Sequence, residues 1–105
     1  MKKIIVGEMG TGRLKRALKD AIDFIKESNG KCFIITRRTN LDRKIVPYCN
    51  EILENSDEKF NIFGKIEIRG KIIPVEQIND NDVVIYDLKS ELTTKYKNCI
   101  IIKEK

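Results

Sequence analysis

The sequence predicts a single three-layer α/β domain over residues 1–105, with a mostly parallel sheet of about four strands covered by two helices. Three observations lead to this fold class. Short apolar runs typical of buried strands occur at 2–6, 31–36 and 83–86. The segment 13–28, between the first two runs, has the period of an amphipathic helix. A strand, a helix and a second strand form a βαβ unit, so the first two strands should be parallel.

The predicted strand at 2–6 ends in an uninterrupted apolar run, which is typical of a central strand with both faces buried. The helix at 13–28 should end at Asn29-Gly30, a dipeptide that favours a left-handed C-terminal cap. Its charged side chains lie opposite the apolar face and should be solvated. The apolar face of this helix consists of Leu14, Ala17, Leu18, Ala21, Ile22 and Ile25.

A second helical pattern covers residues 41–55, although it contains Pro47. A proline inside a helix removes one backbone hydrogen bond and clashes with the preceding turn. Either the helix begins near Pro47, or the proline kinks a longer helix. The first alternative is favoured and predicts a helix centred on 46–55.

Residues 62–76 alternate less regularly and should form an added hairpin with a tight turn at Arg69-Gly70. Pro74 assigns this hairpin to the edge of the sheet, because proline cannot donate a hydrogen bond to a neighbouring strand. An edge of this kind leaves open pairing with a second copy, as a homodimer. A last strand is expected at 99–102.

The composition is that of a folded, basic protein, with 41% hydrophobic and 35% charged residues and a formal net charge of +5. The apolar runs are too short for a membrane span or a signal-peptide core. We therefore expect a cytoplasmic protein, of a cell or of an infected host, without a membrane partner. The chain has three cysteines without a CxxC pair, and it has no histidine. This pattern argues against a structural zinc site and against Ser-His or Cys-His catalysis.

Three glycines follow the first strand, and the helix at 13–28 begins directly after them. Glycine tolerates positive φ and lets the backbone approach an anion closely. Backbone amides of this loop and the positive end of the helix dipole would then face a phosphate. The alternative is a tight turn between strand and helix that holds no ligand. The candidate phosphate- or nucleotide-binding residues are Gly7, Gly10, Thr11, Gly12 and Arg13.

Polar residues also follow two further predicted strands. Arg37-Arg38 follows the strand at 31–36, and Asp87 follows the strand at 83–86. Because the carboxyl ends of parallel strands share one edge of a sheet, these residues and the glycine loop should converge there. Asp87 is therefore the candidate metal ligand. The densest basic cluster, and the candidate nucleic-acid contact, consists of Arg37, Arg38, Arg43 and Lys44.

The segment 7–14, with the sequence GEMGTGRL, resembles the phosphate loop (Walker A) of P-loop NTPases in the form GxxGxGK[ST]. The strand at 83–87, VVIYD, resembles the Walker B strand, whose aspartate holds the metal. Arg13 stands where the family has lysine, and Leu14 stands where it has the hydroxyl residue that binds Mg²⁺. Leu88 stands where hydrolysing members often have an acidic residue. The resemblance implies a P-loop-like fold with decayed catalysis, which holds phosphate or nucleotide without firm Mg²⁺.

The leading functional hypothesis is a small, non-hydrolysing P-loop-like protein. It would bind phosphate or nucleotide, or dock on another protein such as an ATPase, as a regulator of phage or mobile-element origin. The alternative is a nucleic-acid-binding accessory protein that uses the basic residues at 37–44 and the net charge of +5. A Rossmann dinucleotide site is disfavoured, because Lys15 stands where a small residue is needed and no acidic residue ends the second strand.

Overall fold

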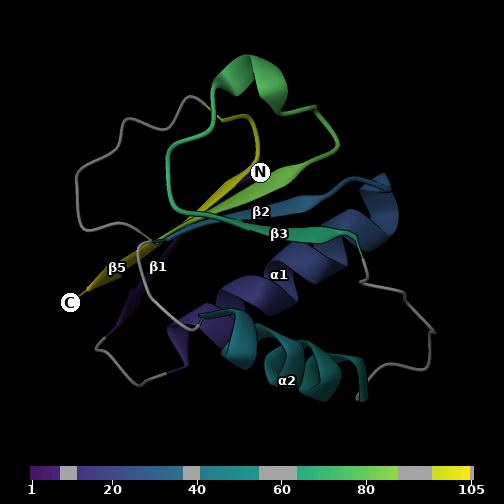
Figure 1. Ribbon diagram of the computed structural model, residues 1–105, viewed down its shortest axis with the longest axis vertical. Helices are drawn as coiled ribbons and strands as arrows, with labels where there is room; N and C mark the ends of the chain where they lie inside the picture. The colour runs from purple at the N-terminus through teal and green to yellow at the C-terminus, as the bar shows by residue number, and fades with distance from the viewer. Residues whose placement is uncertain (8–11, 37–40, 55–63, 88–95, 105) are drawn as a thin grey trace.

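The computed structural model describes residues 1–7, 12–36, 41–54, 64–87 and 96–104 (Figure 1). In this part of the chain a five-stranded sheet has the order β1-β5-β4-β2-β3, and every pairing is parallel. The predicted α/β class and mostly parallel sheet are therefore confirmed, and the fifth strand comes from the segment in which a hairpin was expected. The elements are β1 (Lys2–Gly7), α1 (Arg13–Ser28), β2 (Cys32–Thr36), α2 (Leu41–Glu54), β3 (Ile66–Arg69), the 3-10 turn η1 (Val75–Gln77), β4 (Val83–Asp87) and β5 (Cys99–Glu104).

The connections between the strands form two layers, one on each face of the sheet. The β1-to-β2 and β2-to-β3 connections run in one direction across the sheet, and their helices, α1 and α2, cover the same face (Figure 1). The β3-to-β4 connection runs back across β2, and its η1 segment lies on the opposite face. Crossovers of constant hand produce this separation, because a reversed direction moves the connection to the other face. Helices, sheet and the η1 segment thus make the three layers.

Each face of the sheet has its own hydrophobic core. Under the helices, Leu18 and Ile22 of α1 are fully buried in one cluster with Ile34 of β2. On the other face, Ile73 and Tyr96 cover the sheet, and the Tyr96 hydroxyl donates a hydrogen bond to the Ile73 carbonyl at 2.6 Å. Because both faces are covered there, every residue of β2 is buried.

β1 lies at one edge of the sheet, so the prediction of a central strand for this segment was wrong. β1 and β2 are consecutive in the chain, but β5 and β4 lie between them in the sheet. Ile5 points into the helical core and is only 7% exposed. Ile4 and Val6, whose side chains alternate to the other face, are 56% and 53% exposed. The uninterrupted apolar run is therefore buried on one face only.

The hairpin expected at 62–76 is also wrong for the residues that the structure describes. β3 pairs in parallel with β2, and the chain after Gly70 leads to η1 without forming a return strand. This path carries Ile73, which is 8% exposed, onto the second core. A return strand beside β3 would have left that core uncovered, so burial of apolar surface selects the crossover over the local hairpin.

α2 begins at Leu41 and contains Pro47, so the favoured start near residue 46 was wrong and the longer helix is observed. Pro47 cannot donate the usual backbone hydrogen bond to the carbonyl of Arg43, one turn earlier. Its ring is exposed, whereas Ile45 and Cys49 of the same helix are buried in the core with α1. Tertiary packing of this apolar face offsets the unfavourable proline.

At the amino edge of the sheet, the end of α1 packs closely against the turn that leads into β4. We call this contact the joint. The Asp82 carboxylate, which is 5% exposed, accepts hydrogen bonds from the backbone N–H groups of Lys31 at 2.8 Å and Asn79 at 3.0 Å. Gly30 lies against the backbone of the turn before β4, and a Cβ built on it would be 1.7 Å from the Asn81 carbonyl oxygen. Only glycine fits at this position without moving the backbone.

The three cysteines are free and buried, which predicts unreactive thiols in the folded protein. Burial raises the pKa of Cys49 and that of Cys99 to about 11. Burial, with a smaller contribution from the neighbouring Cys49, raises the pKa of Cys32 even further. At about pH 8 we expect Ellman's reagent to label no thiol of the native protein and all three in denaturant. Rapid labelling of any one of them in the native protein would contradict this packing.

Candidate functional site

The carboxyl ends of the five parallel strands lie along one edge of the sheet. Across this carboxyl edge the last residues are, in order, Gly7, Glu104, Asp87, Thr36 and Arg69. The ends of β1 and β4 are about 10 Å apart, because β5 lies between them. The described elements that follow β2 and β4 lie on opposite faces of the sheet, since α2 packs on one face and Tyr96 on the other. Such a switch point is where open α/β sheets bind ligands.

The amino end of α1 adjoins the end of β1 and has no capping side chain. Gly12 occupies the N-cap with φ 77° and ψ 24°, a left-handed conformation that favours glycine. The first hydrogen bond of the helix runs from the Arg16 N–H to the Gly12 carbonyl at 3.0 Å. The N–H groups of Arg13, Leu14 and Lys15 precede it and have no helical acceptor. No acidic residue stands in this first turn.

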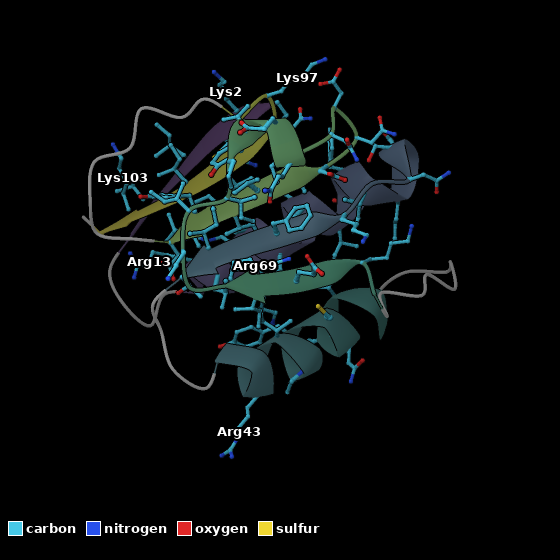
Figure 2. All side chains as sticks on the ribbon, turned by 45° about the horizontal axis from the view of Figure 1, so that its top comes forward. Lys2, Arg13, Arg43, Arg69, Lys97 and Lys103 are labelled. Carbon is cyan, nitrogen blue, oxygen red and sulfur yellow. The ribbon has the colours of Figure 1, made fainter. Side chains whose placement is uncertain are left out.

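Arg13 is buried at this helix end although it is charged, with 5% of its surface exposed. Among the described residues, no ion pair or hydrogen bond of its side chain is found. Its neighbour Lys15, by contrast, pairs with Glu51 of α2. Figure 2 shows Arg13 near the end of the molecule where the strands finish, with Lys97 at the opposite end. Within the described part of the chain, Arg13 therefore places a positive charge without an ion-pair partner at the carboxyl edge, although none of its nitrogens is fully buried without a hydrogen-bond partner.

Leu14 is 6% exposed and belongs to the helical core, in one cluster with Ile5 of β1. A serine or threonine at this position would bury its hydroxyl among apolar side chains, which is unfavourable without a hydrogen-bond partner. The leucine at position 14 is thus explained by packing, and this position supplies no ligand for a metal.

Asp87 and Thr36 are Cα partners at the ends of β4 and β2. The Thr36 hydroxyl donates to the Asp87 carboxylate at a long distance of 3.5 Å, and Thr36 is 3% exposed. Both residues also have interactions with further groups. Sequence reasoning named Asp87 but missed Thr36, although each residue ends an apolar strand. Within the described ranges, no three His, Cys, Asp or Glu side chains are grouped to hold a metal.

The sequence-predicted residues separate into two groups by position. Gly7, Gly12, Arg13 and Asp87 lie at the carboxyl edge, as expected. Arg43 is exposed on α2 and extends away from the sheet in Figure 2, so it does not join them. Lys44 lies in the same helix turn. The remaining candidates, Gly10, Thr11, Arg37 and Arg38, lie outside the described residues.

A hollow of about 310 Å³ lies at the amino edge, at the other end of the strands. Its lining includes Lys31, Lys65, Asn79 and Asp82. Asp82 is already engaged there by two backbone N–H groups. The hollow is thus separate from the carboxyl edge and coincides with the structural joint at Gly30.

Comparisons with protein-family models, with curated proteins and with solved structures find no match for this chain. No helix among the described residues is long and apolar enough to cross a membrane. The indication of a function therefore comes from the geometry of the chain itself. A buried arginine and an uncapped helix end lie at the carboxyl edge of a parallel sheet.

Proposed function

We propose that this protein binds a phosphate-bearing ligand, such as a nucleotide, at the amino end of α1 and does not hydrolyse it. The observation that carries this proposal is the burial of Arg13 without a counter-charge among the described residues. Most of the Arg13 surface is covered, so the guanidinium has lost part of its hydration and gains from an anionic partner. A phosphate at this position would provide the counter-charge and accept hydrogen bonds from the guanidinium.

The helix end itself supports an anion at the same place. The α1 dipole contributes about half a positive charge there, and the backbone N–H groups of the first turn need acceptors. An acidic side chain in the first turn or at the N-cap usually balances the dipole and accepts hydrogen bonds from these N–H groups. α1 has no acidic residue in its first turn, and its N-cap is a glycine. A Cβ built on Gly12 would meet nothing within 4 Å, so the space beside the N-cap is open. A phosphate oxygen would fit the donors at this helix end.

The absence of hydrolysis is inferred from the residues at the positions of the P-loop motifs. Leu14 is a core residue where the family has a hydroxyl for Mg²⁺, and Leu88 follows Asp87 where an acidic residue often orients water. The chain also lacks histidine, the commonest general base. These residues support a degenerate P-loop NTPase-like domain that holds its ligand without turnover.

Titration with inorganic phosphate, ADP and ATP, each with and without Mg²⁺, tests this proposal by calorimetry and thermal unfolding. A ligand at roughly 100 times its Kd should stabilise the folded state by about 2.7 kcal/mol. We expect the same stabilisation without Mg²⁺, and no release of phosphate from ATP. Unchanged stability with all three ligands would rule out the binding site, and steady hydrolysis above background would contradict the inactive assignment. Salt-sensitive DNA or RNA binding without any response to phosphate would favour the nucleic-acid alternative.

A further inference from the structure

β1 has an unpaired outer side. It pairs with β5, and no other strand of the described sheet adjoins it. The Cys99 N–H donates to the Met1 carbonyl at 2.9 Å, so the peptide groups of Met1 face β5. Because these groups alternate in direction along a strand, Lys2, Ile4 and Val6 direct their N–H and C=O groups away from the sheet. β1 therefore offers a row of donors and acceptors to an added strand.

The exposed side chains of the same residues form an apolar surface beside this row. Ile4 and Val6 are 56% and 53% exposed, and Ile4 lies beside the half-buried Ile101 of β5. The opposite edge of the sheet is different, because β3 has four residues and carries a Glu67–Arg69 ion pair at 3.3 Å. Short, charged edges of that kind prevent unwanted pairing. β1 has six residues, and Ile4 and Val6 in its middle are apolar and exposed.

Basic residues flank the apolar surface. Lys2 and Lys103 are exposed on this face, near the start of β1 and near the end of β5 respectively (Figure 2). Lys3, on the other face, is engaged by Asp20 at 2.6 Å. We call the surface of Lys2, Ile4, Val6, Ile101 and Lys103 the β1 strip; it is apolar in the middle and positive at both ends.

We propose that the β1 strip binds an extended segment of a partner protein, which adds to the sheet beside β1. The segment has apolar side chains opposite Ile4 and Val6, and acidic side chains near Lys2 and Lys103. Main-chain hydrogen bonds to β1 provide affinity, and the alternating side chains provide specificity. The uncovered apolar residues explain why an edge strand has the apolar run of a central one.

The charges favour an acidic partner over a second copy of this chain. The residues of β1 and β5 on this face include two lysines and no carboxylate. A symmetric pair would therefore bring two positive strips together, whereas an acidic segment neutralises them. This inference does not depend on the phosphate site, which lies at the end of α1.

A synthetic peptide tests the proposal directly. It has glutamate at its first and last positions, valine at two alternate positions between them, threonine elsewhere and blocked ends. Fluorescence anisotropy should show saturable binding of the labelled peptide to the full chain. We expect the double variant Ile4→Lys/Val6→Lys, and a peptide with lysine in place of glutamate, each to weaken binding at least tenfold. Ile4→Pro should also weaken binding, because it removes an outward N–H that would bond the added strand. The fold should be kept, because proline is tolerated where the N–H of an edge strand faces solvent.

Ile68→Lys is the matched control, because Ile68 is 38% exposed on β3, at the other edge, and its replacement should leave the affinity unchanged. Circular dichroism and thermal unfolding confirm that each variant keeps its fold. Absent or non-saturable binding overturns the proposal, as does equal affinity for the lysine peptide or for the double variant. A dimer in analytical ultracentrifugation that Ile4→Lys dissociates would assign the strip to a second copy, and would equally overturn it.

Discussion

Replacing Arg13 by glutamine should weaken phosphate or nucleotide binding by roughly 10- to 150-fold, the equivalent of a charged hydrogen bond of about 1.5–3 kcal/mol. Arg13 is 5% exposed at the amino end of α1, where its guanidinium would contact the ligand directly. The stability of the free protein should change by no more than about 1 kcal/mol, because no guanidinium nitrogen of Arg13 is fully buried without a partner. Calorimetric titration measures the first effect, and thermal unfolding without ligand measures the second.

Arg43→Gln is the matched control, since it removes the same charge from an exposed position at the start of α2. It should leave phosphate affinity within about twofold, because exposed charges act weakly at physiological salt. Equal losses in the two variants would show that net charge, rather than a site at α1, determines binding. A loss in Arg43→Gln alone would move the anion site to α2 and support the nucleic-acid alternative.

Gly30→Ala should destabilise the protein by about 3 kcal/mol or more, the largest effect expected of a single methyl group here. A Cβ at this position would lie 1.7 Å from the Asn81 carbonyl oxygen and 2.9 Å from the Asp82 nitrogen. These are backbone atoms, so relief of the clash must shift the loop that holds Asp82. Because domains of this kind are stable by about 5–15 kcal/mol, denaturant unfolding should resolve the change clearly.

Gly70→Ala provides the comparison, because a Cβ built on Gly70 meets nothing within 4 Å and its φ is not in the left-handed region. We expect its free energy of unfolding to stay the same or rise by up to about 1 kcal/mol, through a less flexible unfolded chain. Similar losses at both glycines would mean that the joint at the amino edge does not restrict Gly30.

Elements specified by local signals were predictable. The apolar face and the Asn29 stop define α1, and the structure ends this helix with Asn29 in the left-handed conformation. β2 and β4 are continuous apolar runs, and their burial on both faces confirms that interpretation. The same interpretation failed for β1, because its position depends on β5, almost a hundred residues later in the chain. An apolar run does not show which of its residues are exposed, and in β1 the exposed residues Ile4 and Val6 are themselves apolar.

The remaining errors have the same non-local origin. A hairpin after β3 satisfied local turn chemistry, but burial of Ile73 against Tyr96 required a crossover. At the candidate site, the order of strands and helices along the chain is enough to predict that Gly12, Arg13 and Asp87 share one edge. The burial of Arg13 could not be read from spacing, because it depends on how the strands and helices pack around it.

Backbone amide shifts during a phosphate titration, followed by NMR, test the central claim most directly. If the anion binds at the amino end of α1, the amides of Gly12, Arg13, Leu14 and Lys15 should shift together with one Kd. The chemical shifts of the amides of β3 and of the second half of α2 should not change. Shifts confined to Arg43 and its neighbours, or no shift at all at roughly 100 times the calorimetric Kd, would contradict an anion site at the amino end of α1.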